Sequence, residues 1–310
     1  MKKHCLHLAI TLLCLLLSCQ TVYSQDDDVI SLRIMTYNIR HGAGMDDVID
    51  LDRQASVINN AMPDVVGLQE VDSCVKRSSY KPQAALLGSK TGMYATFGGA
   101  IPLTGGKYGV AILSKEAPMS VRNIPLPGTE KRTLLVCEFQ EYVFACTHLA
   151  LEEENRLASL DIILEEVARW DKPFFICGDW NDIPTSTFVT KIKRAGFRML
   201  SYVSNNSASY TYPAGTPKKL IDYIASYGKV YNSIISRKVL NEPEASDHRP
   251  VVVELTLDSY TTGIQSPTIG NESAEHEVIC DLTGRQIANG YLSKLTKGIF
   301  IQNGKKFVVK

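Results

Sequence analysis

Residues 174–181 read Phe174-Phe175-Ile176-Cys177-Gly178-Asp179-Trp180-Asn181, an apolar run that ends abruptly in an acid and an amide. Four consecutive apolar residues without polar alternation are typical of a strand that is buried on both faces. The polar residues that follow such a strand lie at the edge of its sheet, where loops gather functional groups. The sequence therefore predicts a covered sheet with Asp179 and Asn181 at one edge.

Seven further runs of this kind, separated by helical patterns, extend the prediction to an α/β fold. The strand-like runs are Leu32–Ile39, Val65–Leu68, Val110–Leu113, Leu134–Phe139, Val143–Thr147, Phe174–Cys177, Leu220–Ala225 and Val251–Leu257. The helical patterns are Asp52–Ala61, Gln83–Thr91, Glu152–Trp170 and Thr185–Ala195, the last with Thr185 as its expected N-cap. Short connections such as 139–142 predict antiparallel neighbours, so a purely parallel sheet is disfavoured.

The composition is that of a folded chain without an overall charge preference. Of the 310 residues, 45% are hydrophobic and 21% are charged, which excludes intrinsic disorder as the main state. Lys plus Arg and Asp plus Glu number 33 each, so any site for a polyanion must be local.

The first 24 residues have the zones of a secretory signal peptide. Met1-Lys2-Lys3 precedes the apolar run Leu6–Leu17, which is too short to cross a bilayer as a helix. We expect cleavage after Ser24 and export, with no transmembrane segment. The alternative is a lipobox at 16–19, in which Cys19 would carry a lipid anchor.

Three further regions are expected after the leader. Residues 29–258 carry all the predicted strands and form the main domain. Residues 259–275 are rich in Ser, Thr, Gly and Pro and are interpreted as a linker. Residues 276–310 are expected to form a small β element, with a hairpin turn at Asn303-Gly304.

Polar residues recur where the apolar strands end or begin, as at Asp179. They are Asn38, Glu70, His148, Asn181, Asp222, Asp247 and His248. Carboxylate and amide oxygens suit Mg²⁺, Mn²⁺ or Ca²⁺ rather than zinc. Gly-x-Ser-x-Gly and Walker A motifs are absent from the sequence. A divalent ion, a carboxylate and a histidine can together activate water and neutralise a phosphoryl group, so the set favours phosphate-ester hydrolysis.

Seven fragments in order carry a resemblance to a known family. They are Thr36-Tyr37-Asn38, Leu68-Gln69-Glu70-Val71, Tyr108-Gly109-Val110-Ala111-Ile112-Leu113-Ser114, Thr147-His148-Leu149, Gly178-Asp179-Trp180-Asn181, Ile221-Asp222-Tyr223 and Ser246-Asp247-His248-Arg249-Pro250-Val251. Together they resemble the endonuclease/exonuclease/phosphatase (DNase I-like) superfamily. The resemblance implies a four-layer α/β/β/α sandwich of two mixed β-sheets, with the active site at the top of the sheets.

The resemblance also implies a metal site. Glu70 corresponds to the main ligand, and Asn38 and Asp247 lie near the same ion, for which Mg²⁺ is expected and Mn²⁺ or Ca²⁺ are alternatives. Taken alone, Asn38 would equally fit the cap of a turn, and Glu70 the exposed end of a strand.

Catalytic roles follow for five more residues. Asp179 and Asn181 would orient the attacking water and the phosphate, and their spacing of two places both on one side of an extended segment. His248 would be the general base or a phosphate contact, held in its tautomer by Asp222. His148 would bind a phosphate oxygen. The resemblance leaves open whether Asp179 or His248 takes the proton of the water, and an Asx turn is the structural alternative for Asp179 and Asn181.

Three residues are expected to contact substrate. Tyr108 occupies the position of a phosphate-contacting tyrosine in the family, and Arg77 and Arg156 are candidates whose alternative is a surface ion pair. His41 is a further candidate for the wall of the pocket.

The sequence alone does not decide the class of substrate. A nuclease acting on phosphodiester bonds is the first expectation, and a lipid or small-molecule phosphodiesterase or phosphatase is the second. Basic pairs occur at 131–132 and 218–219, without a larger cluster to mark a nucleic-acid surface. A non-catalytic surface-binding protein of the same fold is the alternative from another class. We expect a monomer.

The tail has a resemblance of its own. Asp281-Leu282-Thr283-Gly284-Arg285 and residues 297–306 are similar to the C-terminal sorting module of secreted Bacteroidetes proteins. The alternative is a small β element that packs against the main domain.

Overall fold

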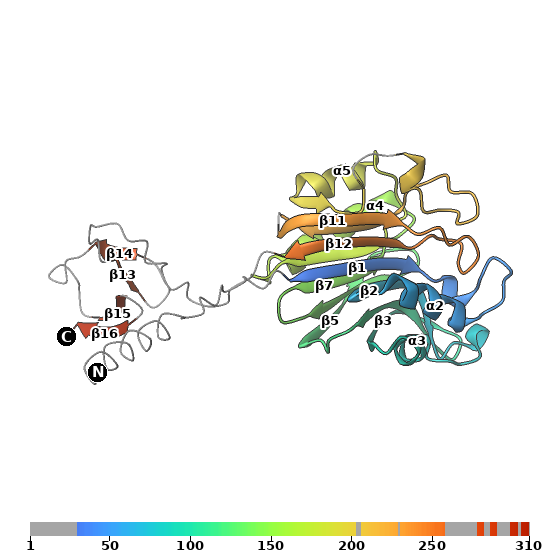
Figure 1. Cartoon of the computed structure of the whole chain (residues 1–310), viewed down its shortest axis with the longest axis horizontal. Helices are drawn as coiled ribbons and strands as arrows, with labels where there is room; N and C mark the ends of the chain where they lie inside the picture. Colours follow the sequence, from blue (N-terminus) through green and yellow to red (C-terminus); the bar gives the residue numbers. More distant parts are fainter. Residues whose placement is uncertain are drawn as a thin grey trace, which may run out of the picture. The chain divides into compact units, whose positions relative to one another are not determined.

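Two six-stranded β-sheets form the body of the protein (Figure 1). The computed structural model describes residues 30–202, 206–228 and 230–257, and the backbone of four short strands between 278 and 309. The chain divides into two units, Met1–Ser259 and Tyr260–Lys310. The expected signal peptide and linker lie outside the described residues.

The first sheet has the strand order β11-β12-β1-β2-β4-β3. Its strands are β1 (Ser31–Asn38), β2 (Val65–Ser73), β3 (Tyr94–Leu103), β4 (Gly106–Ser114), β11 (Tyr231–Val239) and β12 (Val251–Leu257). Strands β1 and β2 are parallel, and the other neighbours are antiparallel. This is the mixed pairing that the short connections predicted.

The second sheet has the order β5-β6-β7-β8-β10-β9. Its strands are β5 (Ser120–Leu126), β6 (Arg132–Glu138), β7 (Val143–His148), β8 (Phe174–Asp179), β9 (Phe197–Met199) and β10 (Asp222–Tyr227). Strands β7 and β8 are parallel and central. Every residue of both is buried, as expected for apolar runs covered on both faces.

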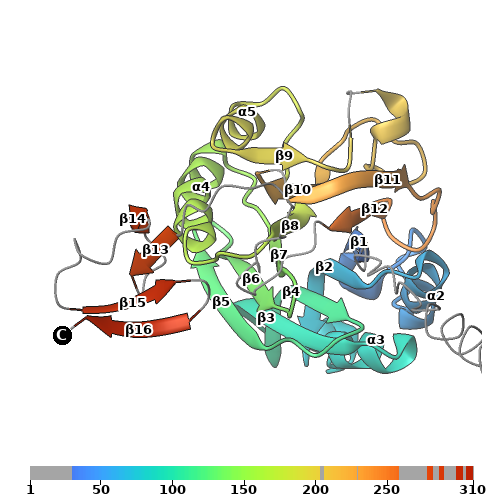
Figure 2. The same ribbon diagram turned by 60° about the vertical axis from the view of Figure 1, so that its left-hand side comes forward.

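Helices cover the outer face of each sheet (Figure 2). Helices α2 (Leu51–Ala61) and α3 (Gln83–Thr91) pack on the first sheet, and α4 (Glu153–Val167) and α5 (Thr187–Arg194) on the second. Three short 3₁₀ turns lie in the loops: η1 (Arg40–Gly42), η2 (Lys76–Ser78) and η3 (Ser207–Ser209). The predicted four-layer α/β/β/α sandwich is confirmed.

The expected N-cap of α5 was wrong by one residue. The side chain of Ser186, not Thr185, accepts a hydrogen bond from the backbone N–H of Val189 at 3.2 Å. Both hydroxyl residues suit this role, and the backbone geometry selects the second.

Four strands that the sequence did not predict are the outermost strands of the two sheets: β3, β5, β9 and β11. An edge strand has a neighbour on one side only and exposes part of its side chains, so it does not need a continuous apolar run. In β5, for example, only Leu126 is buried. The eight predicted strands are the eight interior ones.

The two sheets approach each other closely at Gly67 of β2. A Cβ atom at this position would lie 2.2 Å from the Cys177 Sγ and 2.9 Å from the Cys146 Sγ, both on the second sheet. These thiols are buried and free. The absence of a side chain at Gly67 therefore sets the spacing of the sheets directly below the ends of β7 and β8.

The C-terminal unit contains a separate four-stranded sheet with the order β14-β13-β15-β16. Its strands are β13 (Val278–Asp281), β14 (Gln286–Asn289), β15 (Gly298–Gln302) and β16 (Lys305–Val309). Pairing of Gln302 with Lys305 confirms the predicted hairpin, whose turn lies outside the described residues. In the part of the chain that the structure describes, no helix is long and apolar enough to cross a membrane.

Gly67→Ala tests the close approach of the sheets. We expect the substitution to lower the free energy of unfolding by about 1–3 kcal/mol, because the added methyl overpacks the core. Urea denaturation measures the loss. Combining it with Cys177→Ala should recover part of the stability, since the second change removes the nearest atom. Gly215→Ala is the control, because a Cβ there meets nothing within 4 Å. Equal effects at the two glycines would contradict the close approach.

Candidate active site

The register of the second sheet aligns three of the expected residues across adjacent strands. His148 at the end of β7 pairs with Asp179 at the end of β8, and Asp222 at the start of β10 pairs with Asp179 from the other side. Two carboxylates directly opposite each other repel and are retained only with a compensating partner.

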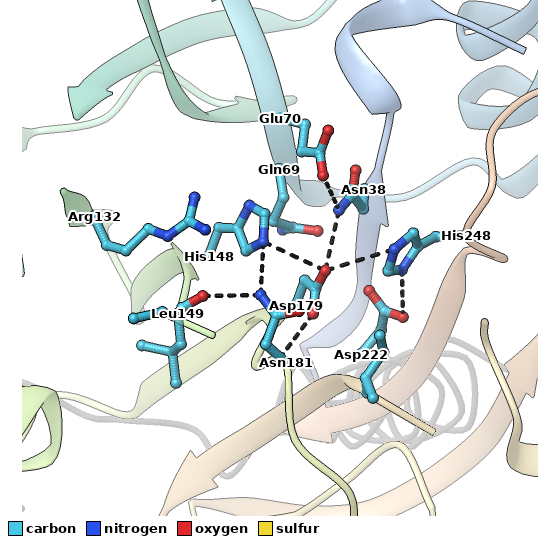
Figure 3. A network of polar contacts seen from close by, with 12 residues as sticks. Asn38, Gln69, Glu70, Arg132, His148, Leu149, Asp179, Asn181, Asp222 and His248 are labelled. Atoms are coloured by element: carbon cyan, nitrogen blue, oxygen red, sulfur yellow. Dashed lines mark hydrogen bonds and ion pairs between the residues drawn. The ribbon is translucent and has the colours of Figure 1, made fainter. Parts of the chain in front are cut away.

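His248 supplies that partner (Figure 3). Its Nδ1 lies 2.9 Å from the Asp222 Oδ2, and its Nε2 lies 3.6 Å from the Asp179 Oδ2. Burial disfavours the imidazolium, but the two carboxylates outweigh it and raise the pKa of His248 to about 10. The predicted pairing of Asp222 with His248 is thus present in the structure.

Asn38 links the two sheets (Figure 3). It is fully buried at the end of β1, and its Nδ2 donates to the Glu70 Oε1 and to the Asp179 Oδ2, each at 3.1 Å. Its Oδ1 accepts a hydrogen bond from the backbone N–H of Arg40 at 3.0 Å. In this orientation the nitrogen of Asn38 positions two carboxylates, and its oxygen is hydrogen-bonded to the backbone of Arg40.

Glu70 projects from an irregularity within β2. The pairing with β4 shifts between Leu68 and Val71, so two residues of β2 face one of β4, and Glu70 has a left-handed φ of 58°. This bulge turns the Glu70 side chain toward the cavity instead of an outer face of the sheet. Burial raises the pKa of Glu70, opposed by the hydrogen bond from Asn38.

Asp179 and Asn181 are brought together by a tight turn. The Asp179 Oδ1 accepts a hydrogen bond from the backbone N–H of Asn181 at 2.9 Å, and Asn181 has a φ of 51°. The expectation of an extended segment was therefore wrong, because β8 ends at Asp179 and an Asx turn follows. Burial raises the pKa of the Asp179 carboxyl, and His248 opposes that rise.

His148 is held by Asn181 in a neutral form. The Asn181 Nδ2 lies 2.9 Å from the His148 Nε2 and also donates to the Leu149 carbonyl oxygen at 2.9 Å. Burial and the Arg132 guanidinium lower the pKa of His148, so its 3.5 Å approach to the Asp179 Oδ2 is not an ion pair. The Nε2 accepts from an amide, so the Nδ1 carries the proton, and no described residue accepts a hydrogen bond from it.

These side chains surround one cavity of about 690 Å³. The expected residues that line it are Glu70, Arg77, Tyr108, His148, Asp179, Asn181, Asp247 and His248. Asn38 and Asp222 lie behind the wall as hydrogen-bond partners of Glu70, Asp179 and His248. The Asp247 Oδ2 is 3.9 Å from the Arg40 Nε, and the Asp247 carbonyl accepts from the backbone N–H of Ala214.

Arg156 does not line this cavity. Its Nε donates to the Asp182 Oδ2 at 3.0 Å, and its Nη1 donates to the carbonyls of Ala150 and Leu151. The guanidinium therefore fixes the loops after β7 and β8 and is not free to contact substrate. His41 is also absent from the cavity wall, and its carbonyl accepts a hydrogen bond from Gln83.

Arg77 lines the cavity, but part of its guanidinium is already hydrogen-bonded to another side chain. It makes two hydrogen bonds of 2.8 Å to the buried Asp72 carboxylate, and its guanidinium lies 5.4 Å from the centre of the Tyr108 ring. Burial raises the pKa of Tyr108, so its hydroxyl stays protonated and can donate to a ligand.

The structure adds residues that the sequence analysis did not assign to the site. Polar additions to the cavity wall are Glu130, Arg132, Asp182, Tyr212 and Lys219, and apolar additions are Ile101, Leu103, Leu151, Ile183 and Ile221. Arg132 and Lys219 belong to the two basic pairs noted above. A charged residue at the start of an apolar run, as Arg132 is before the run that begins at Leu134 in β6, is the signal that could have identified it.

The carboxylates are compatible with a bound cation. Ligand atoms of Asp179, Asp222 and His248 lie within 4.8 Å of one another. However, the 2.9 Å Asp222–His248 contact is the geometry of a hydrogen-bonded pair, and a metal would have to break it. Glu70 and Asp247 offer hard oxygen atoms on the wall of the same cavity, and Glu70 is partly buried without a basic residue in ion-pair contact among the described residues.

Comparison with known proteins identifies the family. The sequence profile of the Endonuclease/Exonuclease/phosphatase family matches residues 35–248. The chain therefore belongs to this family, whose members are phosphoester hydrolases. No curated protein matches the sequence.

Solved structures show the same fold at low sequence identity. An endonuclease/exonuclease/phosphatase from Beutenbergia cavernae is 22% identical, with a TM-score of 0.63 over 90% of this chain and 92% of that one. The mannosyl-6-phosphatase Bt3783 from Bacteroides thetaiotaomicron is 17% identical, with a TM-score of 0.58 over 72% and 99%. Truncated TDP2 from Caenorhabditis elegans is 19% identical, with a TM-score of 0.56 over 73% and 98%.

Glu70→Gln tests the electrostatics of the site. We expect the free energy of unfolding of the metal-free protein to rise by about 1 kcal/mol, because the amide keeps the contact to Asn38 and removes a partly buried negative charge. Urea unfolding in the presence of a chelator measures the change. Asp161→Asn on the exposed face of α4 is the control and should have no effect. A loss of stability in Glu70→Gln would contradict this account.

Proposed function

We propose that this chain is a divalent-metal-dependent phosphoesterase in which water attacks a phosphate ester bound in the cavity. The observation that carries the proposal is the convergence of Glu70, Asp179 and His248, from both sheets, on one space. Glu70 and Asp247 would hold the ion, with Asn38 orienting Glu70 or binding through its oxygen. Mg²⁺ is the expected ion, with Mn²⁺ or Ca²⁺ as alternatives. When bound, it neutralises charge on the phosphoryl group.

Asp179 is suited to orient the attacking water. One carboxylate oxygen is fixed by the backbone of Asn181, and the other receives the Asn38 amide while facing both imidazoles. The water oxygen would form a bond to phosphorus, its proton would pass to Asp179, and the phosphorus–ester oxygen bond would break. The leaving oxygen would take a proton from solvent.

The two histidines then have different tasks. His248 faces carboxylates with both ring nitrogens, an arrangement that favours the imidazolium and makes it a donor to a phosphate oxygen. We therefore propose that Asp179, and not His248, takes the proton of the water. His148 is neutral and stabilises the charge that develops on the phosphoryl oxygens through hydrogen bonding.

The substrate alternatives are a nucleic-acid phosphodiester and a lipid or small-molecule phosphate ester. Leu151 and Ile183 line the cavity with 71% and 44% of their surface exposed, and they would pack against an apolar part of a substrate. The similarity in fold to a mannosyl-6-phosphatase and to TDP2 is compatible with either class.

Export is the second part of the proposal. The basic start and apolar run of residues 1–17 support translocation, with either cleavage after Ser24 or lipid attachment at Cys19. The protein would then act as a monomer in the periplasm, at the cell surface or outside the cell. Residues 276–310 would serve as a sorting signal.

A substrate panel tests the activity. Purified protein with Mg²⁺ or Mn²⁺ should hydrolyse at least one of DNA, RNA, sphingomyelin, phosphoinositides, p-nitrophenyl phosphate and bis-p-nitrophenyl phosphate. Asp179→Ala and His248→Ala should each lower kcat by about 10²–10⁴-fold, because each removes a group that acts in the transition state.

Metal dependence has a separate readout. Mg²⁺ should raise the melting temperature of the wild type and not that of Glu70→Ala. Asp161→Asn should retain both activity and the response to Mg²⁺. If no substrate is hydrolysed although the ion binds, the protein is the non-catalytic alternative and the proposal is wrong.

A further inference from the structure

Two exposed apolar side chains lie at the opening of the catalytic cavity. Leu151 is in the loop after β7 and Ile183 is in the loop after β8, and both line the cavity. The exposed fractions are 71% for Leu151 and 44% for Ile183. Single exposed leucines are common on protein surfaces, but apolar surface beside a polar cavity is typical of a place where a ligand is covered. We call these two residues the apolar pair.

A buried ion pair fixes the loops that carry the apolar pair. The Arg156 Nη1 donates to the Leu151 carbonyl oxygen, and the Arg156 Nε donates to the Asp182 Oδ2 at 3.0 Å. The other oxygen of Asp182 accepts from the backbone N–H of Ile183 at 3.0 Å. The side chains of Arg156 and Asp182 are only 8% and 10% exposed, so separating them would leave a buried charge without its partner. A ligand therefore meets apolar groups on loops that are already ordered, which lowers the entropic cost of binding.

Negative charge surrounds the apolar pair. Residues 152–154, directly after Leu151, are three exposed glutamates, and Asp182 directly precedes Ile183. A polynucleotide carries a phosphate on every nucleotide, and these acids would repel the phosphates next to the one in the cavity. The group that covers the apolar pair should therefore be uncharged.

The basic residues of the cavity wall are too few to hold a chain of phosphates. Arg77 is paired with Asp72, and Arg132 is paired with Glu130. Lys219 is the wall residue of this kind that makes no ion pair within the described residues. Proteins bind a nucleic-acid backbone by neutralising several phosphates with Lys and Arg. This wall instead suits a single phosphoryl group.

The cavity has the size and the lining of a site for a small molecule. Its volume of about 690 Å³ is within the range of roughly 300–1,000 Å³ that is usual for such sites. Three more apolar residues line it, namely Ile101, Leu103 and Ile221. The catalytic groups take up the polar part of the wall, which leaves the apolar part for the rest of the substrate.

We infer that the substrate is a phosphate ester of an uncharged, apolar alcohol, and that Leu151 and Ile183 bind the alkyl or aryl group of this alcohol. The inference rests on the proposed function, since the phosphoryl group lies in the same cavity. Covering the apolar pair removes apolar surface from water, and each fully buried methylene of the ligand is expected to raise the affinity by about 4-fold.

The binding test uses phosphonates, whose carbon–phosphorus bond is not hydrolysed. With Mg²⁺ present, calorimetry should show that the wild type binds hexylphosphonate tighter than methylphosphonate by about 10-fold or more. The double variant Leu151→Ser/Ile183→Ser should lower this ratio to about 3-fold or less, because the alkyl chain then meets hydroxyl groups. The ratio cancels any effect on the phosphonate group that both ligands share. Phenylphosphonate in the same series distinguishes an aryl from an alkyl preference.

Val121→Ser is the matched control. Val121 on β5 is 48% exposed, which is similar to Ile183, and it is not among the residues that line the cavity. This variant should keep the wild-type ratio. A wild type that binds both phosphonates equally, or a double variant that is folded by thermal unfolding and keeps the ratio, would overturn the inference.

The kinetic test compares esters that differ only in the apolar group. One pair is hexyl phosphate and glycerol 1-phosphate, and the other is the hexyl and methyl diesters of p-nitrophenyl phosphate. In each pair that is hydrolysed, the hexyl ester should have the higher kcat/KM, and the double variant should lower it by about 10-fold or more and lower its partner by much less.

The outcomes separate this inference from the proposed function. If esters are hydrolysed without a preference for the hexyl group, or if an oligonucleotide has the highest kcat/KM, the proposed function stands and the inference is wrong. If no ester is hydrolysed but the affinity for hexylphosphonate depends on the apolar pair, the proposed function fails and the assignment of the apolar site stands.

Discussion

The Asn38 amide is the contact on which the arrangement of the site depends. It donates to Glu70 of its own sheet and to Asp179 of the opposite sheet, and the hydroxyl of Ser246 donates to its backbone carbonyl at 2.7 Å, which ties the loop that carries His248 to the same point. Four segments, at residues 38, 70, 179 and 246, are thereby fixed together. The close packing at Gly67, one layer below, keeps the sheets near enough for the amide to reach both carboxylates.

The site concentrates groups that are unfavourable elsewhere in a protein. Glu70 and Asn181 have left-handed backbone conformations, and five carboxylates line one cavity, among them those of Glu70, Asp179 and Asp247. Their repulsion is offset by an imidazole on one side, and a cation would offset it on the other.

The sequence predicted the strands that are buried on both faces and missed the strands at the edges of the sheets. Strands such as β8 are buried on both faces, so their apolar runs are required by the fold and visible in the sequence. An edge strand such as β5 meets a neighbour on one side and solvent on the other, and its composition is constrained much less. The order of polar residues after apolar runs likewise identified six of the residues that line the cavity, because a strand that ends at an active site must stop being apolar there.

The sequence by itself determined the layered architecture, the family and the residues that meet at the sheet ends. Buried strands require apolar runs, and the helices between them require a helical pattern of apolar residues, so this architecture is visible in the order of residues along the chain. Only the tertiary structure decided that Asn38 presents its nitrogen to two carboxylates, that Arg156 fixes loops, and that Arg132 reaches the cavity. Such assignments depend on which atoms lie within about 3 Å of one another across the two sheets, and that spacing has no counterpart in the linear order of residues.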